Sequence, residues 1–128
     1  MKHHPSHIAI GENEYVETLG LEFDDIEPGL VVEHRPGFTF SWEEARYRAA
    51  IAGDHSPVLI DPAAAAYAGG GKAEISQAWI LGAFAAATTR AFGRVVANLA
   101  WINVSFANPI RDGDTVFAES EILDKRES

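Results

Sequence analysis

The sequence of 128 residues contains no cysteine. This absence excludes disulfide bonds, thiolate metal sites and thiol nucleophiles, and it agrees with a cytoplasmic location, which we expect for this protein. Basic residues are also scarce, because 10 Lys plus Arg stand against 19 Asp plus Glu and give a formal charge of −9. Binding to nucleic acid requires a basic surface, so we expect no nucleic-acid partner.

Long hydrophobic runs are missing as well. The longest apolar run covers residues 78–87, whereas a membrane span needs roughly 20 residues. Residues 1–10 lack the apolar core of a signal peptide. The 47% hydrophobic and 23% charged residues are typical of a soluble globular protein. We therefore expect no membrane partner, a polar lead-in over residues 1–17, and a single domain over residues 18–128.

The first half of the expected domain begins with a turn and a strand. Residues 23–29 are acidic and contain proline and glycine, which predicts a turn. Residues 30–40 are rich in β-branched and aromatic residues and are interrupted at Pro36-Gly37. This pattern predicts a bent strand or a hairpin.

A helix is predicted immediately after this strand. Ser41 followed by Glu44 has the spacing of a capping box, in which each side chain bonds the other residue's backbone N–H. The helix then runs from Trp42 to about Ala52 and ends at Gly53.

Two more helices and two strands complete the pattern. Asp61-Pro62 opens a short alanine-rich helix that ends in the glycines 69–71, and residues 74–92 predict a long helix that is apolar on nearly every side. Residues 95–106 are β-rich, and residues 115–123 alternate apolar and polar side chains. This order predicts an α+β domain in which a sheet wraps around one helix.

The segment 53–62 carries the candidate chemistry. The carboxylate of Asp54 lies between Gly53 and Pro57, so that a turn fixed by glycine and proline aims it without flexing. Asp54 is a candidate catalytic base, and the alternative is a side chain that stabilises its own turn. His55 is a second candidate, because an imidazole is a common general acid or base in proteins, although adjacent side chains usually point apart and a solvent-facing role is the alternative.

Three stretches together resemble a known family. They are Phe23-Asp-Asp-Ile-Glu-Pro-Gly, Ala52-Gly-Asp-His-Ser-Pro, and the whole of residues 96–128. They resemble the MaoC-like dehydratases, and the third is most similar to the mesaconyl-CoA hydratase and β-methylmalyl-CoA dehydratase branch. The resemblance covers about residues 18–128. It implies the hotdog fold, an antiparallel sheet curled around a long buried helix.

The resemblance also implies an activity. The family pattern Gly-Asp-x-Asn-Pro-x-His supplies an Asp and a His that act as an acid–base pair on an acyl-CoA thioester, without a metal or redox cofactor. Here Gly53 and Asp54 match, Ser56 replaces the Asn, and Leu59 stands where the His is expected. Because a leucine cannot carry a proton, His55 is the nearest group that could replace it.

Further substrate contacts are expected at the start of the long helix. The family places a His-Gly pair there, whereas this chain has Ser76 and Gln77, which can donate hydrogen bonds to a substrate. A backbone N–H at that helix terminus would polarise the thioester oxygen. Lys72 is a candidate contact for a CoA phosphate. It does not belong to a P-loop, because the required upstream glycine and the following Ser or Thr are absent.

The resemblance also concerns assembly. Family members continue beyond the strand that here ends near residue 128, so we expect the last strands of the sheet to be lacking. An open strand edge favours a homodimer, or a heteromer with another hotdog subunit. A second hypothesis is therefore a non-catalytic hotdog subunit that binds acyl-CoA or completes a heteromeric dehydratase.

The remaining candidates have ordinary explanations. His3, His4 and His7 could bind a metal adventitiously, but a flexible tail is the expected structure, and we predict no metal site. His34 is expected to be structural or exposed. Four aromatic residues are expected in the core: Trp79, Phe84, Phe92 and Trp101.

Overall fold

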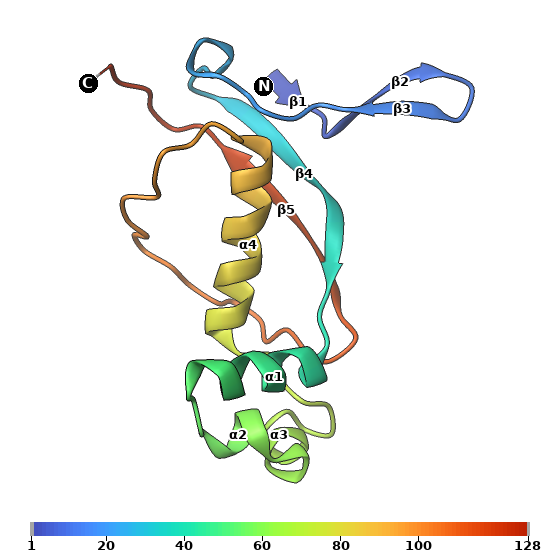
Figure 1. The fold of residues 1–128 in the computed structure, drawn as a ribbon, viewed down its shortest axis with the longest axis vertical. Coiled ribbons are helices and arrows are strands. Elements are labelled where there is room, and N and C mark those ends of the chain that lie inside the picture. The colour runs from blue at the N-terminus through green and yellow to red at the C-terminus, as the bar shows by residue number, and fades with distance from the viewer. Residues whose placement is uncertain (1, 128) are drawn as a thin grey trace. The chain divides into compact units, whose positions relative to one another are not determined.

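A computed structural model describes residues 2–127 as a mixed α+β chain (Figure 1). The strands are β1 (Lys2–His4), β2 (His7–Gly11), β3 (Glu14–Glu17), β4 (Leu30–Thr39) and β5 (Thr115–Glu121). The helices are α1 (Trp42–Ala52), α2 (Pro57–Ile60), α3 (Pro62–Ala68) and α4 (Gln77–Ala91), with a 3-10 helix at Phe23–Asp25. Residues 2–127 form two compact units: the first contains residues 2–37, 84–100 and 117–127, and the second contains Phe38–Ala83 and Trp101–Val116.

Strand β4 is the middle strand of a three-stranded sheet with the order β1-β4-β5 (Figure 1). β1 runs parallel to β4, with Lys2 beside Leu30. The N–H of Ile122 donates to the carbonyl of Leu30 at 2.9 Å, so the end of β5 lies at the start of β4 and these two strands are antiparallel. β2 and β3 form a separate antiparallel hairpin.

Burial alternates along β4, a segment predicted as extended from its β-branched and aromatic residues. Leu30, Val32 and His34 are buried, whereas Glu33 and Arg35 are only partly covered. Successive side chains of a strand point to opposite faces, so the sheet has one buried face and one face that reaches solvent. The buried face packs against the end of α4. The cluster there contains Leu30, Val32, Ala91, Leu21, Phe92 and Ile122.

The Pro36-Gly37 break does not create a hairpin. β4 continues through it as one strand to Thr39. Proline lacks the N–H that a ladder needs and is tolerated where a strand has a free side. β1 pairs only with residues 30–32 of β4, so no hydrogen bond from β1 requires an N–H at Pro36.

The helices around the candidate segment begin and end as predicted. α1 ends at Ala52, and Gly53 follows in the left-handed conformation with φ of 72°, which glycine adopts without the cost of a Cβ. Asp61 caps α3, because its Oδ1 accepts the N–H of Ala63 at 2.9 Å. The short helix α2 between them was not predicted.

The predicted capping box of α1 is wrong. The Ser41 side chain makes no capping hydrogen bond, and Glu44 instead pairs with Arg48 at 2.9 Å. The first backbone N–H of the helix, that of Trp42, donates to Oδ1 of Asp112 at 2.9 Å. A carboxylate that is distant in the sequence therefore caps the helix.

This arrangement predicts unequal effects of two substitutions. We expect Asp112→Ala to lower the free energy of unfolding by about 1 kcal/mol, the usual value of a lost cap, and Ser41→Ala to change it by less than about 0.3 kcal/mol. Asp112→Asn, which keeps an oxygen acceptor, should lose less than Asp112→Ala. Urea denaturation followed by circular dichroism would measure all three variants. A larger loss in Ser41→Ala than in Asp112→Ala would contradict the assignment.

The long helix is shorter and less buried than expected. α4 begins at Gln77 rather than near Glu74, because Glu74 forms an antiparallel bridge with Arg111. Its buried residues lie three or four positions apart on one stripe: Ile80, Ala83, Ala87 and Ala91. The prediction that this helix is buried on most sides is therefore wrong within the described residues 2–127. α4 instead buries one stripe, as an ordinary amphipathic helix does. None of the helices in that range is long and apolar enough to cross a membrane.

The predicted strand over residues 95–106 does not form, whereas the strand predicted at residues 115–123 appears as β5. Within 95–106, Val96 is fully exposed and Leu99 is 95% exposed. Trp101, expected in the core, is 50% exposed. A β-rich sequence becomes a strand only when a neighbour satisfies its backbone, and no strand within residues 2–127 does so for this segment.

The N-terminal residues also differ from the expected flexible tail. They form β1, β2 and β3. Lys2 and His4 of β1 pair with β4, so that the tail joins the sheet.

Candidate functional site

The candidate carboxylate lies in the turn between α1 and α2, within the second unit. The N–H of Asp54 donates to the carbonyl of Ala49 at 2.9 Å, which ties the turn to the end of α1. Oδ1 of Asp54 accepts the N–H of Ser56 at 3.0 Å. Asp54 is otherwise exposed to solvent. The carboxylate therefore stabilises its own turn, and its second oxygen remains available.

The residues near Asp54 differ in their exposure to solvent. His55 is exposed, like Asp54. Leu59 is buried with 9% exposure, and its N–H donates to the carbonyl of Ser56 at 2.9 Å. Among residues 2–127, no hydrogen bond or ion pair joins Asp54 to another titratable side chain. An imidazole at position 59 would lie on the buried side of this short helix.

A cavity of about 300 Å³ lies at the start of α4. Its lining combines polar and apolar groups in similar amounts: the polar residues are Glu74, Gln77 and Asn108, and the apolar residues are Ile75, Ile80, Phe106, Pro109 and Ile110. The volume is at the lower end of the range for small-molecule sites.

The predicted substrate-binding residues are divided between locations. Gln77 lines the cavity, whereas Ser76 immediately precedes α4 and its carbonyl accepts the N–H of Ile80 at 3.0 Å. Lys72 is exposed in the connection between α3 and α4. Gly53 and Ser56 belong to the Asp54 turn and do not line the cavity.

Residues 106–110 contribute to the cavity although the sequence did not indicate it. The carbonyl of Ile110 accepts the N–H of Ile75 at 2.8 Å, which holds this segment beside the start of α4. The Asn108-Pro109 pair signalled only a turn. Which helix a turn contacts depends on long-range pairing that local sequence does not encode.

Most basic side chains that could contact an anionic ligand already form ion pairs within the chain. Arg90 pairs with Glu17, and Arg94 pairs with Glu22 at 2.9 Å. Nε of Arg111 is buried without a hydrogen-bond partner. Lys72 therefore remains the exposed cation for which residues 2–127 provide no ion pair.

His34 is buried in the first unit. Its Nε2 lies 2.8 Å from Oγ of Ser120, and its ring meets that of Phe92 edge-on at 6.3 Å. Burial is the main cause that lowers the pKa of His34, and the nearby Arg35 lowers it further, against an opposing effect of Glu119. A neutral His34 joins β4 to β5, which is a structural role.

The sequence profile of the MaoC like domain matches residues 25–128, which is most of the chain. The chain belongs to the MaoC-like domain family. Members of this family share the hotdog fold and include dehydratases and hydratases. Neither a search of the curated proteins nor a search of the solved structures returned a significant match.

The MaoC-like match includes both parts of the candidate site. The Asp54 turn and the cavity at the start of α4 lie within residues 25–128. Strands β1, β2 and β3 lie outside the matched range. The family assignment therefore concerns the Asp54 turn and the cavity, and not the N-terminal strands.

Proposed function

We propose that this protein is a MaoC-like enoyl-CoA hydratase or 3-hydroxyacyl-CoA dehydratase, acting on an acyl-CoA thioester without a metal or redox cofactor. The observation that carries the proposal is the family match over residues 25–128, together with the Gly53-Asp54 turn inside it. Within the family we propose the branch that hydrates mesaconyl-CoA, on the resemblance of residues 96–128 to that branch. A short acyl group also agrees with the cavity of about 300 Å³.

In the proposed reaction, water adds to the β-carbon of the enoyl thioester and a proton is added to the α-carbon. Asp54 has one carboxylate oxygen engaged by Ser56, and the other would accept the proton of the attacking water. The enolate oxygen needs hydrogen-bond donors, and the backbone N–H groups at the start of α4 and the Gln77 amide are the candidates. His55 is the candidate proton donor.

A second function has its own supporting observations. Leu59 is buried and apolar where the family pattern has a histidine, and the hydrophobic residues of 95–106 are exposed. Exposed apolar patches of this kind mark protein interfaces. The chain would then be a non-catalytic hotdog subunit that binds acyl-CoA, either in a homodimer or in a heteromer with a second hotdog subunit.

Turnover assays distinguish the two functions. Purified protein is incubated with crotonyl-CoA, mesaconyl-CoA and longer enoyl-CoAs, and the loss of the enoyl thioester absorbance is followed. Turnover by the chain alone supports the enzyme. Turnover that requires a separately purified MaoC-like subunit from the same genome, with a change in mass measured by light scattering, supports the subunit. If neither condition gives turnover and no acyl-CoA binds, both proposals are wrong.

Leu59→His tests whether the second acid–base group is what the site lacks. We expect hydratase activity to rise at least tenfold, since a positioned proton donor contributes about 10²–10⁴-fold and the new side chain will be imperfectly placed. The control is Val58→His, which adds an imidazole at the neighbouring, 40% exposed position. Equal activity of the two variants, both folded and both binding CoA, would contradict the assignment of position 59.

A further inference from the structure

We propose that the solvent-facing side of the β1-β4-β5 sheet holds a binding site for one divalent transition-metal ion, formed by His3, Glu33 and Glu119. The site lies in the first unit, whereas Asp54 belongs to the second. His3 also lies outside the segment that matches the MaoC-like family. The inference does not rest on the proposed function.

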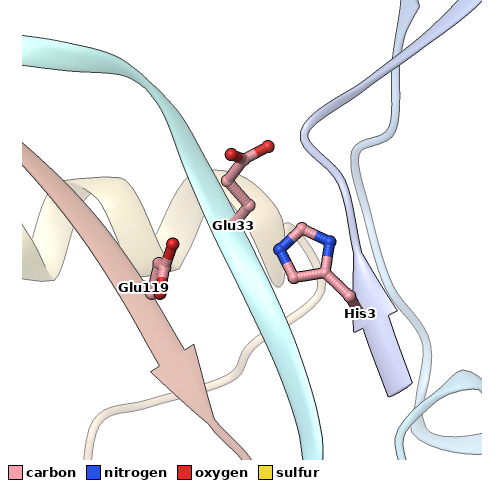
Figure 2. A group of neighbouring side chains, drawn as sticks. All are labelled: His3, Glu33 and Glu119. Atoms are coloured by element: carbon pink, nitrogen blue, oxygen red, sulfur yellow. The ribbon is translucent and has the colours of Figure 1, made fainter. Parts of the chain in front are cut away.

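The three side chains come from three neighbouring strands (Figure 2). His3 is on β1, Glu33 on β4 and Glu119 on β5. One ligand atom of each lies within 4.8 Å of the others. Alternation along β4 places Glu33 on the face opposite Val32, which is completely buried, so the group reaches solvent.

Glu33 is already held in position by the chain. Its Oε2 accepts the N–H of Ser6 at 3.1 Å and the hydroxyl of Ser6 at 3.3 Å. Such hydrogen bonds fix a ligand's orientation before the ion arrives. His3 and Glu119 are exposed and can rotate toward Glu33.

Arg35 lies between the two carboxylates. Its Nη2 is 2.9 Å from Oε1 of Glu33 and 3.8 Å from Oε1 of Glu119. One guanidinium balances only one of the two negative charges, so the group retains a net negative charge. Nη1 of Arg35 also donates to the carbonyl of His34 at 3.0 Å, and the guanidinium lies 4.9 Å from the ring centre of Phe117. These contacts can hold Arg35 in place while Glu119 turns to an ion.

The donor set selects the class of ion. One imidazole nitrogen and two carboxylate oxygens bind Zn²⁺ and its first-row neighbours, whereas Ca²⁺ and Mg²⁺ prefer oxygen alone. Bonds of about 2.0–2.2 Å place the ligand atoms of a tetrahedral zinc site about 3.3–3.6 Å apart. Closing the observed group to that size requires side-chain rotations that move the ligand atoms by about 1 Å, and it leaves a fourth coordination position for water.

Zinc titration of the full chain without an affinity tag tests the site. The protein is treated with EDTA, desalted and titrated with ZnCl₂ by calorimetry at pH 7.4. We expect one ion per chain with a dissociation constant on the order of 10 μM, weaker than four-ligand structural sites. His3→Ala and Glu119→Gln should each weaken binding at least tenfold, and zinc should raise the melting temperature of the wild type but not of Glu119→Gln.

Two control variants separate this site from adventitious binding by the N-terminal histidines. His7→Ala removes a histidine of the same segment, and His55→Ala removes an exposed histidine of the second unit. Both should bind zinc like the wild type. The proposal is overturned if Glu119→Gln binds zinc as tightly as the wild type, if His7→Ala weakens binding as much as His3→Ala, or if no saturable binding occurs. Glu119 is on β5, so its conservative variant remains informative even if His3→Ala disturbs β1.

Discussion

Asp54→Asn should lower kcat/KM for enoyl-CoA hydration by about 10²–10⁴-fold, the usual contribution of a positioned general base. Asparagine retains a side-chain oxygen that can accept the N–H of Ser56, a bond that is 3.0 Å long in the wild type, and it forms this type of turn as readily as aspartate. The turn is therefore expected to persist while the base is lost. The thermal unfolding midpoint should change by less than about 2 °C, since no stabilising contact is removed.

The matched control is Asp61→Asn. Asp61 is an exposed aspartate in the same segment, and its carboxylate caps α3 through Ala63. Removing its charge should leave kcat/KM within about twofold, because a cap tolerates asparagine. If the chain acts only within a heteromer, both variants are measured in that complex. An Asp54→Asn enzyme with more than half of the wild-type activity would show that Asp54 only stabilises its turn.

Val32→Lys should lower the free energy of unfolding by about 4 kcal/mol or more. Val32 is the largest fully buried side chain given by the structure, with 0% exposure, and it packs in the cluster with Leu30 and Ala91. A lysine at this position loses its hydration without gaining a partner. Small domains are stable by only about 5–15 kcal/mol in total. We therefore expect most of the variant to be unfolded or insoluble, as measured by urea denaturation and by the soluble fraction.

Val31→Lys provides the control on the same strand. Val31 points to the opposite face and is only partly buried. A lysine there reaches solvent on the same face as the acidic Glu33, so the free energy of unfolding should change by less than about 1 kcal/mol. Equal losses in the two variants would contradict the alternation of β4, and would mean that both faces of the sheet are covered.

The sequence alone determined the local features of this protein. Helix α1 could be bounded because Gly53 supplies a left-handed residue where the helix ends, and α3 because Asp61 precedes a proline. Strand β5 follows from the alternation of apolar and polar residues in its segment, and β4 from its content of β-branched and aromatic residues. The hydrogen-bonded turn around Asp54 could also be predicted, because every group that forms it lies within a few residues.

Only the tertiary structure decided which distant residues meet. It assigned the cap of α1 to Asp112 instead of Ser41, and it left residues 95–106 without a partner strand although their composition favours one. It also brought the first residues to β4, which placed His3 beside Glu33 and Glu119. Backbone groups and charges are satisfied by whatever the fold brings within about 3–4 Å, and local sequence does not specify those neighbours.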